Sequence, residues 1–185
     1  MPIQENSSGP VLRSTTILAV RHKGKTAVAG DGQVTMESSI IKHGAKKVRR
    51  IYNDKIIVGI AGATADAMTL SEKLESKLER YNGNLTRAAV ELARDWRTDK
   101  FLRRLEALMI AVDEKSMYLI SGNGDVIEPD TGILSIGSGS TGARAAATAL
   151  VNHSDLDAAA IVKESMLIAS SICVYTNSEI TLEEL

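Results

Sequence analysis

Short apolar runs along the chain predict strands, and turn residues between them predict how these strands pair. The runs are rich in Val, Ile and Leu, and they cover residues 16–20, 26–29, 48–52, 55–61, 108–112, 117–121, 126–127, 133–136, 173–175 and 180–182. Runs this short, with many β-branched residues, favour strands over helices. Lys23-Gly24 and Asn53-Asp54 are turn sequences, so we expect antiparallel hairpins there. Gly30 and the residues directly after it end the second run.

Four longer segments have apolar residues at helical spacing. Apolar residues recur every four positions from Leu70 to Leu78, which predicts an amphipathic helix with Thr64 as its N-cap and its end near residue 80. An apolar face over residues 89–96 predicts a second helix, with Thr86 as its N-cap. An alanine-rich segment ending near residue 151 predicts the third. The fourth is expected from an N-cap at Asp155 to about residue 170.

The order of these elements is strands, two helices, strands, two helices, strands. A parallel sheet needs strands and helices in alternation, so this order predicts antiparallel sheets with helices on their outer faces, an α+β architecture. A chain of 185 residues is long enough for one domain with a sizeable core. We expect that domain at residues 15–185, after a polar leader at residues 1–14.

Composition excludes several classes of partner and location. The net charge of −1 argues against nucleic acid as the main ligand, and the basic run at residues 46–50 is typical of a solvated strand face. The single cysteine, Cys173, has no partner for a disulfide, which favours a reducing compartment, the cytoplasm, and a buried structural thiol. No apolar stretch approaches the roughly 20 residues that span a bilayer, and the leader lacks the apolar core of a secretory signal.

A glycine loop is the first candidate site. Gly137, Gly139 and Gly142 follow a predicted strand and open a predicted helix, as in a dinucleotide-binding loop, and Asp157 lies 20 positions after Gly137. However, Asp157 falls in the first turn of a helix instead of at the end of a second strand. The loop also comes too late in the chain to begin a dinucleotide-binding domain. A tight strand-to-helix turn is therefore favoured over nucleotide binding.

Thr15, Asp31 and Lys47 form the second candidate site. An N-terminal threonine differs from an internal one because its free α-amine can act as the general base for its own hydroxyl. A buried lysine nearby would keep that amine neutral by like-charge repulsion, and an aspartate would hold the lysine charged. With a leader attached, the nitrogen of Thr15 is an amide and no base. Residue types alone do not bring the three side chains together, and on that ground a structural Thr15 is favoured.

Long motifs in the body of the chain are more specific. The segments "TTILAV", "AGDGQVT", "AKKVRRIYNDKIIVGIAGATADAMTL", "GNLTRAAVELARDWRTDKFLRRLEALMI", "SGNGDVIEPD", "IGSGS" and "ICVYTN" followed by "EEL" closely resemble the HslV (ClpQ) family. These are peptidase subunits of the ATP-dependent HslUV protease, related to proteasome β subunits. The resemblance covers residues 15–185 without an obvious large gap, and the leader lies outside it.

The resemblance implies a fold and an active site. The fold would be the N-terminal nucleophile hydrolase sandwich, with two antiparallel sheets between two helix layers. Thr15 matches the nucleophile, and Asp31 and Lys47 match the pair that tunes its amine. Ser138 matches a serine that hydrogen-bonds near that amine. The main-chain N–H of Gly62 would donate to the oxyanion, where the absence of a Cβ lets a substrate approach.

The resemblance also implies a bound ion, an assembly and a partner. Ser170, Cys173 and Thr176 match a loop whose main-chain carbonyls bind a monovalent cation, usually sodium. Family members form two stacked hexameric rings with the active sites facing an inner chamber. The hexameric ATPase HslU docks on each end, uses ATP, and threads unfolded proteins in. The rival hypothesis is an uncleaved, catalytically silent ring subunit.

Four features depart from the family pattern or complicate it. The glycine loop continues as Ser-Thr-Gly-Ala at residues 140–143, where Gly-Gly-x-Tyr is frequent, and Ser170 replaces a usual glycine of the cation loop. Met68 and Ser71 stand where phenylalanines are frequent. The leader is long for the family, and Ser14 is a rival first residue because some relatives use an N-terminal serine. The register of "TTILAV" favours Thr15.

Overall fold

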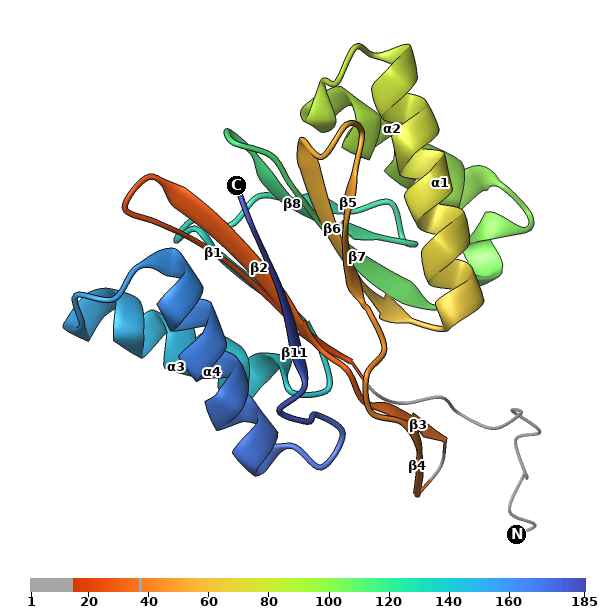
Figure 1. Ribbon diagram of the computed structural model, residues 1–185. Helices are drawn as coiled ribbons and strands as arrows, with labels where there is room; N and C mark the ends of the chain where they lie inside the picture. Colours follow the sequence, from red (N-terminus) through yellow and green to blue (C-terminus); the bar gives the residue numbers. More distant parts are fainter. Residues whose placement is uncertain (1–14, 37) are drawn as a thin grey trace, which may run out of the picture.

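Two antiparallel sheets form the centre of the computed structural model, which describes residues 15–36 and 38–185 (Figure 1). The first sheet has the strand order β10-β1-β2-β11. Its strands are β1 (Thr16–His22), β2 (Lys25–Asp31), β10 (Ile133–Gly137) and β11 (Ile180–Glu184). The second sheet has the order β5-β6-β7-β8-β9. Its strands are β5 (Val48–Ile51), β6 (Ile56–Gly62), β7 (Ala107–Val112), β8 (Met117–Ser121) and β9 (Val126–Ile127).

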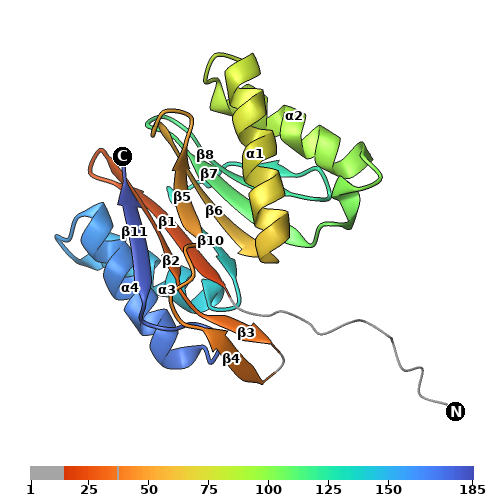
Figure 2. The same ribbon diagram turned by 45° about the vertical axis from the view of Figure 1, so that its right-hand side comes forward.

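Helices cover the outer faces of the two sheets (Figures 1 and 2). The helices α1 (Thr64–Arg80) and α2 (Leu85–Thr98) lie on the second sheet, followed by the short 3-10 helix η1 (Leu102–Arg104). The helices α3 (Ser140–His153) and α4 (Ala158–Ile172) lie on the first sheet. The predicted α+β fold is therefore confirmed as a four-layer αββα sandwich. Within the part of the chain that is described, no helix is both long and apolar enough to cross a membrane.

Three apolar clusters fill the three interfaces between the four layers. Between the sheets, Ile17 and Ala19 of β1 meet Ile57 of β6 and Ile110 of β7. Leu18 and its neighbours on the other face of β1 pack against α3 and α4. Strand β1 is thus buried on both faces, which explains why its sequence is uniformly apolar instead of alternating.

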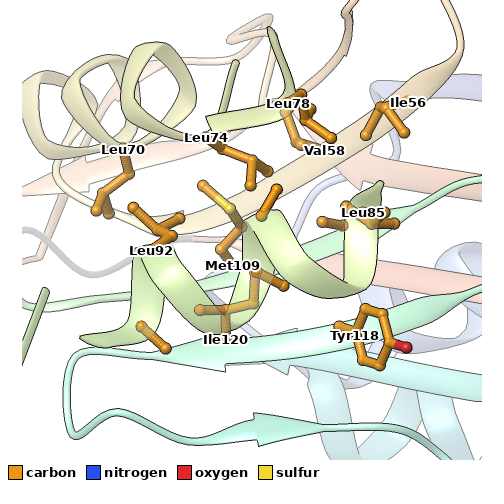
Figure 3. Packing of buried hydrophobic residues seen from close by; sticks show 14 of the residues in the cluster. Ile56, Val58, Leu70, Leu74, Leu78, Leu85, Leu92, Met109, Tyr118 and Ile120 are labelled. Carbon is orange, nitrogen blue, oxygen red and sulfur yellow. The ribbon is translucent and has the colours of Figure 1, made fainter. Parts of the chain in front are cut away.

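The leucine repeat of α1 belongs to the largest of these clusters. Leu70, Leu74 and Leu78 are fully buried between α1, α2 and the second sheet. Figure 3 shows the three leucines above Met109 and Ile120 of that sheet. Burying a leucine side chain stabilises a fold by roughly 1.5–3 kcal/mol, so this face fixes the position of α1.

Three helix caps differ from the sequence expectation. Thr64 is the first residue of α1, and Ala63 is the N-cap, without a side-chain bond. Asn84 caps α2 by accepting a hydrogen bond from the amide of Arg87. The predicted cap, Thr86, instead shares a hydrogen bond between its hydroxyl and that of Tyr118, over 2.9 Å.

The N-cap of α4 is Asp157, two residues after the predicted Asp155. Its carboxylate accepts a hydrogen bond from the amide of Ala160 over 3.0 Å. The predicted strand at residues 173–175 is wrong, because the amide of Thr176 donates to the carbonyl of Cys173 and closes a turn there.

Strand β2 continues through Asp31 instead of ending at Gly30. Beyond it, the chain forms a hairpin that the sequence did not predict, β3 (Val34–Met36) and β4 (Ser39–Lys42). Both figures show this hairpin projecting from the end of the sandwich. The expected leader at residues 1–14 lies outside the described residues, so its boundary stays a prediction.

Candidate active site

Thr15 lies at the start of β1, at one end of the sandwich. Only 5% of its surface is exposed, and its carbonyl accepts a hydrogen bond from the amide of Ser138 over 2.8 Å. Gly137, with φ of +93°, approaches so closely that a Cβ there would lie 1.9 Å from the carbonyl oxygen of Thr15. Only glycine fits this contact, which fixes the glycine loop against the backbone of Thr15.

The hairpin of β1 and β2 brings Asp31 to the same end. The register pairs His22 with Lys25 and Ile17 with Gly30, so the next position places Asp31 opposite Thr16. The amide of Thr16 donates to Asp31 Oδ1 over 2.7 Å. The short turn at Lys23 and Gly24 therefore determines which carboxylate lies beside the start of β1.

Four donors surround the carboxylate of Asp31, which is fully buried. Oδ1 accepts from the amide of Thr16 and from Lys47 Nζ, the latter over 2.9 Å. Oδ2 accepts from the amides of Gln33 and Asn177, over 3.0 and 3.4 Å. These contacts satisfy both oxygens of a carboxylate that is shielded from water, and they fix its orientation.

Lys47 lies just before β5 and forms an ion pair with Asp31. Its ammonium group also donates to the carbonyl of Gln33 over 2.5 Å. Burial lowers the pKa of Lys47 from its ordinary value, while the charge of Asp31 and its hydrogen bond to the lysine oppose that shift. Burial therefore favours the neutral form of Lys47, and Asp31 favours its charged form.

A second junction connects β1 to the loops around it. The hydroxyl of Thr16 accepts from the amide of Gly139 over 2.9 Å and lies 2.7 Å from the hydroxyl of Thr176. A Cβ on Gly139 would come within 2.7 Å of both hydroxyl oxygens. The glycine loop thus turns its amides onto the β1 backbone and side chains, which supports the predicted tight turn over a nucleotide site.

A cavity of about 230 Å³ opens beside Thr15. Gly62, at the end of β6, lies in its wall, and a Cβ there would come within 2.8 Å of the carbonyl oxygen of Glu106. The cavity is lined by Thr15, Val34, Lys42, Ala45, Lys46, Lys47, Arg49, Val58, Ile60, Gly62, Ala63 and Ala67. It has an apolar floor and several cationic side chains, and none of the described residues that line it is acidic.

The charged residues of the basic run at residues 46–50 line the cavity or form an ion pair. Lys46, Lys47 and Arg49 line the cavity, and Arg50 forms an ion pair with Glu183 over 2.7 Å. The prediction of a solvated strand face holds for Lys46, which is exposed. It fails for Lys47, Arg49 and Arg50, which are half-buried and contact the cavity or the other sheet.

The structure gathers Thr15, Asp31, Lys47 and Gly62 at one end of the sandwich. Ser138 joins them through its main-chain amide, while its side chain is exposed. Sequence reasoning gave no role to several polar groups of the site. These are Thr16, Gln33, Arg49 and Asn177.

The three residues expected to hold a cation lie at the end of α4 and in the turn that follows. The carbonyl groups of the last helical turn have no partner within the helix, and the helix dipole places negative charge there. Ser170 lies in that turn, and the carbonyl of Cys173 already accepts one hydrogen bond, from Thr176. Main-chain oxygens in such a place suit a hard monovalent cation. Cys173 is half-buried, not buried as predicted.

Comparisons with known proteins agree with this geometry. The family described as "Proteasome subunit" matches residues 11–185. The chain is similar to the "ATP-dependent protease subunit HslV" of Aquifex aeolicus (strain VF5), with 60% identity over 174 residues that cover 94% of this chain and 99% of the relative.

Solved structures give the same result. The chain is similar to eukaryotic HslV from Trypanosoma brucei, with a TM-score of 0.88 and 47% identity, covering 92% of this chain and 98% of the other. BPH of Thiobacillus denitrificans, solved in complex with epoxomicin, shares the fold, with a TM-score of 0.70 and 18% identity, covering 92% of this chain and 97% of the other. The chain therefore belongs to the proteasome subunit family and, within it, to the HslV protease subunits.

Proposed function

We propose that the chain is a threonine peptidase whose nucleophile is Thr15, and that it degrades unfolded proteins in the cytoplasm. The observation that carries this proposal is the position of Thr15 at the mouth of a cavity. The next residue, Thr16, donates its amide to Asp31 of the buried Asp31–Lys47 ion pair. Lys47 supplies positive charge at that site, and Asp31 holds it there. This is the arrangement that an N-terminal threonine needs to use its own amine as a base.

The site becomes active when the leader is removed. In one route, the hydroxyl of Thr15 attacks the carbonyl of Ser14 and the peptide bond shifts to an ester. Water then hydrolyses the ester, which restores the hydroxyl and frees the α-amine. In the other route, an aminopeptidase trims the leader. In both, the nitrogen of Thr15 changes from an amide into a base with an ordinary pKa near 7.7–8.0.

Peptide cleavage then proceeds in two steps. The Thr15 amine takes the proton of the Thr15 hydroxyl, and the oxygen attacks the substrate carbonyl. The tetrahedral intermediate expels the substrate amine, which takes up the proton, and leaves an ester on Thr15. Water hydrolyses that ester and regenerates the hydroxyl. The positive charge of Lys47 lowers the pKa of the amine and stabilises negative charge that develops on the threonine oxygen.

Two further groups serve the substrate. The N–H of Gly62 stabilises the oxyanion, a contribution whose loss typically costs on the order of 100–1,000-fold in rate. The apolar floor formed by Val58, Ile60 and Ala67 receives the side chain before the cleaved bond. Ser138 helps to hold the freed amine in place.

The cation and the partner complete the proposal. The carbonyl groups of Ser170, Cys173 and Thr176 would hold sodium, which would fix the turn after α4 beside Thr16 and take no part in bond making. Relatives are described as subunits of an ATP-dependent protease. We therefore expect two stacked hexameric rings and the ATPase HslU as the partner that consumes ATP and delivers substrate.

The first experiment is intact mass and N-terminal sequencing of the purified protein, followed by peptide hydrolysis with and without the ATPase. We expect a chain that starts at Thr15 and an activity that Thr15→Ala abolishes and Thr15→Ser partly keeps. A start at Ser14 would move the nucleophile by one residue. A chain that keeps its leader and has no activity would support the silent subunit. Undiminished activity of Thr15→Ala or Lys47→Ala would rule out the proposed mechanism.

A further inference from the structure

Asn177 occupies the centre of a junction that the proposed mechanism does not use. Its side-chain oxygen accepts from the amides of Gly32 and Glu179, over 3.1 and 3.2 Å. Its side-chain nitrogen donates to the carbonyl of His43 over 2.9 Å. The residue is half-buried, and all three of these side-chain hydrogen bonds are made with main-chain groups.

These contacts join the loop after α4 to the two segments that flank the β3–β4 hairpin. Gly32 directly follows Asp31, and His43 begins the segment that leads to Lys47. The two segments also touch directly, since the amide of Ala45 donates to the carbonyl of Gly32 over 2.9 Å. The third segment is the loop after α4, which contains Asn177 itself.

The backbone of Asn177 reaches the ion pair. Its amide lies 3.4 Å from Asp31 Oδ2, on the side of the carboxylate opposite the Lys47 contact. The same loop also contacts Gln33, because the side-chain nitrogen of Gln33 donates to the carbonyl of Val174 over 2.9 Å. The loop after α4 therefore contacts both segments that carry the ion pair.

The chemistry of this junction requires an amide side chain. The oxygen of Asn177 faces two N–H donors and its nitrogen faces a carbonyl, so only one orientation of the amide satisfies all partners. An aspartate of the same shape would turn an anionic oxygen toward the carbonyl of His43. It would also add a second negative charge close to Asp31.

We propose that Asn177 is a positioning residue for peptide cleavage, which holds Asp31 and the segment that carries Lys47 in their places around Thr15. This inference rests on the proposed function. Asn177 does not touch the reacting atoms in this proposal. It acts through Asp31 and Lys47, so its loss lowers the rate of the chemical step. The apolar part of the cavity, formed by Val58, Ile60 and Ala67, lies on β6 and α1 and shares none of the hydrogen bonds of this junction.

The test compares Asn177→Ala and Asn177→Asp with Asn84→Ala in the mature enzyme assembled with its ATPase. Asn84 is a control of the same residue type, because its side chain also accepts a hydrogen bond from a main-chain amide, that of Arg87, at the start of α2 and away from the cavity. Loss of a helix cap lowers Tm by about 2–4 °C in a chain of this size. We expect Asn84→Ala to show that shift with unchanged kcat.

For Asn177→Ala we expect a similar change in Tm but a kcat that falls about 10- to 100-fold, because small misplacement of catalytic groups has effects of this order. KM should stay within about twofold of the original. Asn177→Asp, which keeps the shape, should lose at least as much kcat. A kcat equal to that of Asn84→Ala in both Asn177 variants would overturn the proposal. If Thr15→Ala retained activity, the proposed function itself would fail, which is a separate result.

Discussion

The amide of Thr16 donates to Oδ1 of Asp31 over 2.7 Å, so the residue after the proposed nucleophile is bonded to the carboxylate that pairs with Lys47. This bond does not involve the nitrogen of Thr15. It forms in the chain that still carries residues 1–14, so the Asp31–Lys47 pair does not depend on removal of the proposed leader. In the proposed mechanism, activation would require the cleavage of one bond and no rearrangement of the ion pair.

Replacing Asp31 by Asn should lower kcat/KM by at least about 100-fold and change its pH dependence. Burial lowers the pKa of Lys47 and Asp31 raises it, so without the carboxylate charge the pKa of Lys47 falls further. Lys47 then loses its proton at a lower pH, and the alkaline fall in kcat/KM should move to lower pH. The measurement is a pH profile from about pH 6 to pH 10.5 for both enzymes.

Glu183→Gln is the control for this experiment. It also removes the charge of a carboxylate that pairs with a cation, since Glu183 contacts Arg50. We expect its pH profile to match that of the unmodified enzyme. A profile of Asp31→Asn that keeps its alkaline limb in place would contradict the assigned role of Lys47.

Replacing Gly137 by Ala should unfold or strongly destabilise the protein. The residue has φ of +93°, and a Cβ would lie 1.9 Å from the Thr15 carbonyl oxygen, so β1 and the glycine loop would have to separate. We expect a loss of more than about 3 kcal/mol in the free energy of unfolding. Gly24→Ala is the matched control, because φ is +76° there but no atom lies within 4 Å of the Cβ. It should cost only about 1–2 kcal/mol, as measured by urea unfolding.

Peptides with Lys or Arg before the cleaved bond should be poor substrates. Lys42, Lys46 and Arg49 line the cavity beside Thr15, and like charges placed there repel. We expect kcat/KM at least about tenfold lower than for the same peptide with Leu, which corresponds to about 1.4 kcal/mol. Arg49→Ala should narrow this ratio, whereas Arg94→Ala, on the exposed face of α2, should leave it unchanged. Equal rates for Lys and Leu peptides would show that the side chain binds elsewhere.

Cys173→Ser should keep both peptidase activity and any dependence on monovalent cations. In the proposed site, the main-chain carbonyl of Cys173 is the ligand, and a hydroxyl in place of the thiol leaves that carbonyl unchanged. The check is hydrolysis of a Leu peptide across a series of sodium and potassium concentrations. A cation response that disappears in Cys173→Ser would assign the ligand to the side chain instead.

The sandwich could be predicted from the sequence because burial determines its elements. Strand β1 reads as one apolar run since both of its faces are covered, and the leucines of α1 repeat every four positions since one face of the helix is buried. Local sequence signals gave wrong helix caps where a side chain bonds to a residue far away in the sequence. Thr86 has the chemistry of a cap, but its hydroxyl bonds to Tyr118, and Asn84 caps the helix instead. All four residues of β4 are exposed, including Ile40 and Ile41, so this strand of the β3–β4 hairpin has no buried face that would give a recognisable pattern.

The site was predictable only in part. Asp31 could have been placed opposite Thr16 by counting back from the turn at Lys23 and Gly24, since the hairpin pairs residues in strict register. Lys47 could not, because it reaches Asp31 from the segment before another sheet. The roles of Thr15, Lys47 and Gly62 came from the resemblance to a family. Asn177 gave no local signal, because its partners become neighbours only in the folded chain.

The loop after α4 contacts the start of β1, which determines when during synthesis the site can first be complete. The hydroxyls of Thr16 and Thr176 that touch in the site are 160 positions apart, which at about 5–20 residues per second separates their synthesis by roughly 10–30 seconds. The amide of Asn177 reaches Asp31 across 146 positions. A ribosome-bound chain therefore carries the threonine for most of its synthesis without the residues that complete its surroundings.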